Sequence, residues 1–122
     1  MKTHFILYVA DQMKSTEFYS SVLGSEPTMV APGMTEFLLA DDTVLGLMPN
    51  AGASRLLNIE VSEFESSRCE VYLVVDDADD YHKRALSAGA RELSPLAARD
   101  WGHRAAYSLD PDGHVLAFAQ PI

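Results

Sequence analysis

The sequence has little cysteine, little tryptophan and few basic residues. Of its 122 residues, one is a cysteine, Cys69, and one is a tryptophan, Trp101. A single cysteine forms no disulfide within the chain and cannot build a cysteine-rich metal site. Lysine and arginine number 9 against 18 aspartates and glutamates, so the formal net charge is −9. This negative field repels nucleic-acid phosphates and anionic membrane surfaces, so we expect neither kind of partner.

Long apolar runs and the common nucleotide motifs are also missing. No stretch approaches the roughly 20 apolar residues that a membrane-spanning helix requires. The apolar run Phe5–Ala10 is too short for a signal peptide, and no small-residue cleavage site follows it. The sequence contains no P-loop, dinucleotide fingerprint or nucleophile elbow. With 48% hydrophobic and 22% charged residues, the composition is typical of a globular protein. We therefore expect one cytoplasmic domain that spans residues 1–122.

Two segments, 4–24 and 70–89, follow the same order. Each has a short apolar run rich in β-branched and aromatic residues, then an aspartate, an amphipathic stretch and a glycine. The apolar runs favour strands, and the amphipathic stretches favour helices. Asp11 and Asp76 stand where a helix N-cap belongs, and Gly24 and Gly89 stand where a helix ends. Each segment therefore predicts a strand followed by a helix.

The remainder of each half repeats as well. Residues 37–46 and 107–117 both indicate a strand, an acidic turn and a strand, and Asp110-Pro-Asp-Gly113 is a strong turn sequence. Weaker strands are expected around 27–30 and 91–93. Self-similarity at this spacing favours two fused copies of a βαβββ unit. We place the first module at about 1–50, a linker at about 51–67 and the second module at about 68–122.

Two stretches carry a resemblance to a known family. They are Phe5–Gly24, with its Glu17-Phe-Tyr19 and Val22-Leu-Gly24, and Trp101-Gly-His-Arg104 followed by Ser108-Leu-Asp-Pro-Asp-Gly113. In this order and spacing the chain resembles, over nearly its whole length, the vicinal-oxygen-chelate superfamily of glyoxalases, bleomycin-resistance proteins and extradiol dioxygenases. The resemblance implies an α+β fold of two tandem βαβββ modules, which form an open cup-shaped mixed sheet with helices on the outer face. It also implies a ligand cavity, usually completed in a homodimer, and we expect a homodimer.

The resemblance also implies where a metal would be held. In metal-dependent members the first and last strands of each module supply one ligand each, which here fall on His4, Gly46, Glu70 and Ala117. Such a metal acts as a Lewis acid on vicinal oxygens of the substrate. Glycine and alanine offer no side-chain ligand, whereas catalytic zinc generally keeps three protein ligands. We therefore expect no bound metal and no other cofactor.

Strand alternation places polar and aromatic side chains on the face opposite the helices. His4 shares a face with Tyr8, and Glu70 shares a face with Tyr72. Aromatic and methionine side chains suit a ligand cavity, although they are equally typical of a core. Trp101 is the exception, because its neighbours are polar. The expected ligand-binding residues are His4, Tyr8, Met48, Glu70, Tyr72, Trp101, His103 and Tyr107. Phe37 is expected to face the cavity too, and His82 and His114 are interpreted as surface residues.

Three functions remain open. A small-molecule-binding protein, which sequesters a drug or metabolite, fits the missing metal ligands and the aromatic cavity, and the negative charge favours a cationic or aromatic ligand. Of the three, we favour this non-catalytic binding function. A metalloenzyme, either a glyoxalase-like lyase or isomerase or a dioxygenase-like enzyme, would need metal ligands from elsewhere. A metal-free enzyme would use His4 and Glu70 as an acid–base pair.

Overall fold

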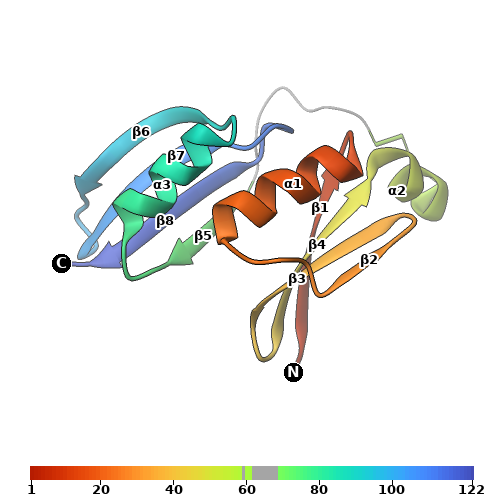
Figure 1. Ribbon diagram of the computed structural model, residues 1–122, viewed down its shortest axis with the longest axis horizontal. Helices are drawn as coiled ribbons and strands as arrows, with labels where there is room; N and C mark the ends of the chain where they lie inside the picture. Colours follow the sequence, from red (N-terminus) through yellow and green to blue (C-terminus); the bar gives the residue numbers. More distant parts are fainter. Residues whose placement is uncertain (59, 62–68) are drawn as a thin grey trace. The chain divides into compact units, whose positions relative to one another are not determined.

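The structure is a computed structural model that describes residues 1–58, 60–61 and 69–122 (Figure 1). Its elements, in chain order, are β1 (Thr3–Val9), α1 (Gln12–Leu23), β2 (Met29–Ala31), β3 (Met34–Ala40), β4 (Thr43–Pro49), α2 (Asn50–Leu57), β5 (Glu70–Val74), α3 (Ala78–Ser87), β6 (Arg91–Ala98), β7 (His103–Leu109) and β8 (Val115–Pro121).

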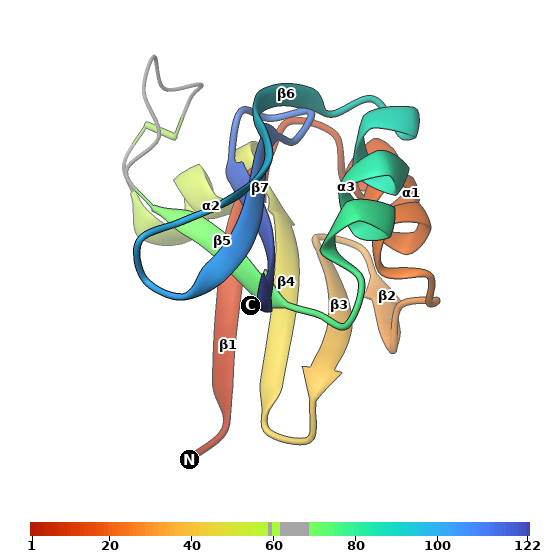
Figure 2. The ribbon, with the colours of Figure 1, turned by 90° about the vertical axis from the view of Figure 1, so that its left-hand side faces the viewer.

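The chain divides into two compact units, each built around one four-stranded sheet. Unit 1 holds β1 to β4, most of α1, and α2, and its strands lie in the order β1-β4-β3-β2 (Figure 2). Unit 2 holds β5 to β8 and α3, with the order β5-β8-β7-β6. In both sheets the first and last strands pair in parallel and the other neighbours are antiparallel. The α+β class and the two βαβββ modules are thereby confirmed.

The helix ends follow the capping residues of the sequence, with one shift. At the start of α1 the Asp11 carboxylate accepts a hydrogen bond from the Lys14 backbone N–H, and Gly24 ends the helix with a φ of 67°. A left-handed residue of this kind favours glycine. At α3 the N-cap is Asp77, which accepts from the Asp80 N–H, so the assignment of Asp76 was wrong by one residue. The helix begins at Ala78, so Asp77 is the residue directly before it and its carboxylate reaches the N–H of the third helical residue, Asp80.

One face of the first sheet forms the core of unit 1 under α1. Phe37, Leu45 and Leu47 lie on this face and are at most 1% exposed. The buried Thr35 hydroxyl links the same face to the helix, because it accepts from Gln12 Nε2 at 3.0 Å and lies 2.9 Å from the Thr16 hydroxyl. The opposite face of this sheet carries the alternate residues, among them His4 and Glu36.

The second sheet is covered in the same way. The ring of Tyr81 on α3 lies 5.6 Å from the ring of Phe118 on β8. The Ala78 N–H at the start of α3 donates to Gln120 Oε1 at 2.7 Å. Phe118 and Gln120 alternate with Ala117 and Ala119 along β8, so α3 covers one face and the other carries the alternate residues.

The stretch between the modules is only partly described. Where the sequence indicates a linker at 51–67, residues Asn50–Leu57 form α2, whose Ala53 is buried. Residues 62–67 of that linker lie outside the described residues. The two weaker strands are present as β2 and β6, and β6 extends well beyond the expected 91–93. Among the described residues, no helix combines the length and the apolar character needed to cross a membrane.

The burial pattern of unit 1 predicts the effect of leucine truncation. Leu47 is fully buried under α1, so Leu47→Ala should lower the free energy of unfolding by about 2–5 kcal/mol. Leu38, on the neighbouring strand β3, is 49% exposed, and Leu38→Ala should cost less than about 1 kcal/mol. Urea denaturation measures both changes. Equal losses for the two variants would contradict the assignment of the core face.

Candidate functional site

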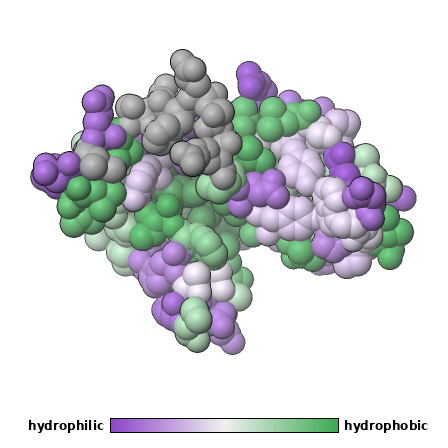
Figure 3. All heavy atoms as spheres, turned by 180° about the vertical axis from the view of Figure 1, so that it is seen from behind, coloured by the Kyte–Doolittle hydropathy of each residue, from purple (hydrophilic) through white to green (hydrophobic). Residues whose placement is uncertain are grey.

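The open face of the second sheet collects the aromatic residues expected at the site. Tyr72 and Tyr107 both pair with Ala117 on β8, from opposite sides, so the three side chains point to the same face. Glu70 and His103 share this face by alternation along β5 and β7. Since Phe118 packs against α3, this face points away from the helix. Seen from behind, its surface is mostly pale, neither strongly hydrophobic nor strongly hydrophilic (Figure 3).

Three side chains on this face are joined by hydrogen bonds. Trp101 Nε1 donates to the Tyr72 hydroxyl oxygen at 2.9 Å. The same oxygen lies 2.7 Å from His103 Nδ1. The rings of Tyr72 and His103 also stack, with centroids 5.9 Å apart and an interplanar angle of 21°. The structure thus brings together Trp101, Tyr72 and His103, which the sequence analysis singled out separately.

A tight connection between β6 and β7 presents Trp101. The Arg99 N–H donates to the His103 carbonyl at 2.8 Å, which closes the loop around Asp100, Trp101 and Gly102. Gly102 has a φ of 87°, a conformation that residues with a side chain rarely adopt. Trp101 remains 53% exposed, so part of its side chain is available for contact.

Arg99 secures this loop and was missed by the sequence analysis. Its guanidinium donates to Ser94 Oγ at 2.8 Å, to the Ala105 carbonyl at 2.8 Å and to the Pro95 carbonyl at 3.1 Å. Its Cζ also lies 5.3 Å from the centre of the Tyr107 ring, within the range of a cation–π contact. Only its position beside Trp101 in the sequence hinted at a structural role.

Electrostatics connect Tyr107 with Glu70 across the sheet. Burial is the main cause that raises the pKa of the Tyr107 phenol above its ordinary value, and the negative charge of Glu70 raises it further. Tyr72 acts in the same direction, and the positive charge of Arg99 opposes it. The open face of unit 2 is therefore partly sheltered from water and carries a carboxylate, while its arginine is already engaged.

The open face of the first sheet holds the residues expected from the first module. His4, Ile6 and Tyr8 alternate along β1, and Tyr8 pairs with Met48 on β4. His4 Nδ1 lies 3.5 Å from Glu36 Oε2 on β3, and both side chains are partly exposed. Seen from behind, the surface of this unit is hydrophobic at mid-height and more hydrophilic at its lower end (Figure 3). Glu36 was not among the expected site residues.

Phe37 and His82 correct two sequence interpretations. Phe37 was expected to face the cavity, but it is 1% exposed on the α1 side of β3, and its neighbour Glu36 takes the open face. His82 was interpreted as a surface residue, but it is 4% exposed, and its Nε2 lies 2.9 Å from Glu92 Oε2. A carboxylate partner on β6 allows this ring to be buried without an unpaired Nε2.

The residues at the four family metal positions do not fit a metal ion. His4 and Glu70 begin the open faces of their sheets, but Gly46 and Ala117 provide no side-chain donor. A Cβ added at Gly46 would lie 3.1 Å from Ile6 Cγ1 and 3.3 Å from Met34 Sδ, so apolar atoms already crowd this position. Within the described residues, no three histidine, cysteine, aspartate or glutamate side chains form a group that could hold an ion.

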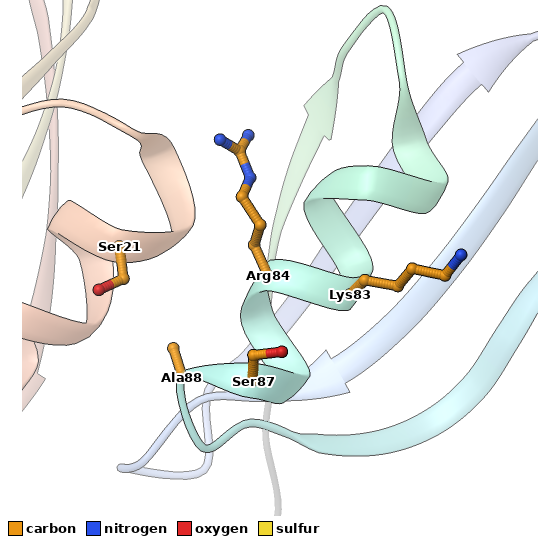
Figure 4. A pocket seen from close by; sticks show the side chains of 5 residues that line it. All are labelled: Ser21, Lys83, Arg84, Ser87 and Ala88. Carbon is orange, nitrogen blue, oxygen red and sulfur yellow. The ribbon is translucent and has the colours of Figure 1, made fainter.

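Two basic residues of α3 pair with aspartates one turn earlier in the same helix. Figure 4 shows Lys83 and Arg84 leaving α3 in different directions. Lys83 Nζ pairs with Asp79 at 2.8 Å, and Arg84 Nε pairs with Asp80 at 3.6 Å. A hydrogen bond and the charge of Asp79 raise the pKa of Lys83. Pairs four residues apart are ordinary helix-surface features, so this cluster does not indicate a second site.

The raised pKa of Tyr107 yields a test of its surroundings. Glu70→Gln removes a negative charge beside the phenol, so the pKa of Tyr107 should fall. Absorbance titration at alkaline pH, taken as the difference from a Tyr107→Phe variant in the same background, measures this pKa. Glu17→Gln on the exposed side of α1 is the matched control and should leave it unchanged. If the pKa of Tyr107 were unchanged in Glu70→Gln, the Glu70 carboxylate would not lie near the Tyr107 phenol.

The same pKa predicts a loss of stability at alkaline pH. The folded protein holds the Tyr107 proton more tightly than the unfolded chain, so this contribution is complete below the ordinary value of 10.0. It disappears as the pH rises through the folded-state pKa. Urea denaturation across this range should therefore show a smaller alkaline loss of stability in Tyr107→Phe than in the wild type.

Comparison with known proteins identifies relatives of this arrangement. The family model described as Glyoxalase/Bleomycin resistance protein/Dioxygenase superfamily matches residues 3–118. A glyoxalase-related enzyme from Fulvimarina pelagi superposes with a TM-score of 0.87 at 21% identity, covering 98% of this chain and 87% of that one. A glyoxalase/bleomycin resistance protein/dioxygenase family enzyme from Burkholderia phytofirmans gives a TM-score of 0.86 at 18% identity, covering 98% and 97%. At these identities the likeness establishes the fold.

Curated relatives match a shorter part of the chain. An uncharacterized protein of Mycobacterium bovis is 38% identical over 52 residues, which make up 43% of this chain and 34% of that protein. The matched segment thus spans about a third of that relative's length. The family model, in contrast, covers nearly all of the chain. The chain therefore belongs to the Glyoxalase/Bleomycin resistance protein/Dioxygenase superfamily.

Proposed function

We propose that the protein binds a small molecule, a drug or a metabolite, without transforming it. The supporting observation is the open face of unit 2, where Trp101, Tyr72 and His103 are linked by hydrogen bonds. Convergent polar groups beside exposed aromatic surface are characteristic of ligand sites. In this proposal the ligand stacks on the Trp101 indole, and its polar atoms meet Tyr72, His103 and Glu70.

The chemistry of this face favours an aromatic or cationic ligand. Glu70 is exposed and negatively charged, and it is close enough to Tyr107 to raise the pKa of that phenol. Arg99, the nearby cation, is engaged by Ser94 and two backbone carbonyls. Tyrosine and tryptophan rings attract organic cations through their electron-rich faces. His4, Tyr8 and Met48, on the corresponding face of unit 1, are the equivalent candidate residues of that unit.

The proposal includes a degenerate metal site. Gly46 and Ala117 stand where two ligands are required, and His4 has Glu36 as its charged neighbour. A lyase or dioxygenase of the metal-dependent kind has no complete donor set among these positions. Acid–base catalysis would require His4 to act with Glu70, whereas the carboxylate beside His4 in its own unit is that of Glu36. A homodimer and a cytoplasmic location remain predictions.

Metal affinity tests the first half of the proposal. Calorimetric titration of the untagged protein with zinc, nickel, manganese and iron(II) should give only weak binding, because two side-chain donors are too few for a tight site. His4→Ala should change these weak isotherms little. Tight stoichiometric binding that is lost in His4→Ala would contradict the proposal of a degenerate metal site. Lyase and dioxygenase assays would then be the next experiments.

A ligand screen tests the second half. Aromatic and cationic compounds should shift the emission of Trp101, the only tryptophan of the chain. Tyr72→Phe removes the hydroxyl that anchors both Trp101 and His103, and it should weaken a screened ligand roughly tenfold. The matched control is Tyr81→Phe on the α3-covered face, which should bind as the wild type does. If both variants lose affinity equally, the proposed face is not the binding face.

A further inference from the structure

The hydrogen bonds around Tyr72 have a direction that the donor inventory determines. An indole N–H is a donor only, so the Tyr72 oxygen must accept from Trp101. A phenol carries one hydrogen to donate. Among the described residues, His103 Nδ1 is the only group found within hydrogen-bond distance of Tyr72 that can accept it. With a neutral His103, the chain therefore runs from Trp101 N–H to Tyr72 O–H to His103 Nδ1.

This direction fixes the tautomer of the histidine. A neutral imidazole has one acceptor nitrogen and one N–H. If Nδ1 accepts the Tyr72 proton, the ring hydrogen must be on Nε2. The 2.7 Å separation between the Tyr72 oxygen and Nδ1 is typical of a well-formed hydrogen bond with a hydroxyl.

Protonation of His103 reverses the second bond. The charged ring has an N–H at both nitrogens, so Nδ1 must then donate to the Tyr72 oxygen. That oxygen would accept from Trp101 and His103 at once, which uses both of its lone pairs. The Tyr72 hydrogen can no longer point at His103 and must turn toward another acceptor.

We infer that His103 sets the direction of the Tyr72 hydroxyl, so that Tyr72 offers a hydrogen bond to a ligand only when His103 is protonated. The ligand group that fits is an uncharged oxygen acceptor, a carbonyl, on an aromatic body that stacks on Trp101. This ligand class rests on the proposed function, whereas the proton switch itself does not. Tyr72 is then the specificity-determining residue, and His103 is a positioning residue that acts through it.

Other charged groups near this pair do not replace His103 in that role. Glu70 and Tyr72 share β5, and Tyr107 comes from β7 on the same face. Arg99 is held by Ser94 and two carbonyls before the loop, and Asp100 lies beside Trp101 within it. From β8, His103 pairs with Pro121, which carries no charge. Within the part of the chain that the structure describes, the Tyr72 oxygen is hydrogen-bonded to Trp101 and His103 and to none of these groups.

Nitrogen NMR of the ligand-free protein tests the switch directly. Imidazole ¹⁵N shifts distinguish the two neutral tautomers and the charged ring, and His103→Gln identifies the signals of His103 among the four histidines. At a pH of about 8 the His103 ring should carry its hydrogen on Nε2. A ring with its hydrogen on Nδ1 would overturn the inference, because Tyr72 would then be released without any protonation. If His103→Gln misfolds, Asn substitutions at His4, His82 and His114 assign the signals by elimination.

Trp101 emission provides a second readout. Between about pH 8 and pH 5 the emission should show a step that coincides with the NMR titration of His103, since the acceptor of the indole N–H changes its other bonds. His103→Gln and Tyr72→Phe should abolish this step, and Tyr81→Phe should keep it. A step that persists in both His103→Gln and Tyr72→Phe would assign it to another group and overturn the inference.

Acetophenone tests the ligand class. It carries an uncharged carbonyl acceptor on an aromatic ring and should bind roughly tenfold more tightly at about pH 5.5 than at about pH 8. His103→Gln should remove this difference. Equal affinity at both pH values, or no binding at either, would overturn the ligand class. The proposed function itself fails only if the wider screen yields no compound that shifts Trp101 emission, so the two failures can be told apart.

Discussion

In each unit the first strand pairs in parallel with the last, and this pairing governs the rest of the structure. β1 pairs with β4, and β5 pairs with β8. The other two strands of each sheet follow on the opposite side of β4 or β8. A parallel neighbour requires a crossover, and the helix within that crossover covers one face of the sheet. The other face then carries every second residue of the strands. His4 and Glu70 occupy it for this reason, as do the tyrosines of the second sheet.

Much of the fold could be predicted because its signals are local. The aspartates and glycines at the helix ends, the turn at Asp110–Gly113 and the doubled strand–helix order all lie within short segments. Two of the errors are shifts of one residue. Asp76 and Asp77 are both good N-caps, and only the packed helix decides between them. On β3, Met34, Glu36 and Leu38 alternate with Thr35 and Phe37, so neither face is clearly polar, and Phe37 was assigned to the wrong one.

The sequence predicted which residues line the candidate site, but it did not predict the hydrogen bonds between them. Alternation placed Tyr72 and Tyr107 on one face, and the polar context marked Trp101. The bonds from Tyr72 to Trp101 and His103 join residues 29 and 31 positions apart, and no sequence pattern specifies such contacts. Glu36 and Arg99 were overlooked for a related reason. An isolated charge in a sequence is most often solvated, and only the register of neighbouring strands shows that these two have partners within the fold.

The attachment of Arg99 has a consequence for affinity. Its guanidinium ties the loop to Ser94, Pro95 and Ala105, and the backbone bond between Arg99 and His103 closes it. The indole of Trp101, itself bonded to Tyr72, is therefore held in one orientation before any molecule arrives. Ordering an exposed side chain on binding costs about 0.5–1.5 kcal/mol. Because the Trp101 side chain is already ordered in the folded chain, most of this cost is not incurred on binding. The main entropy loss is then that of the planar ligand itself when it stacks on Trp101.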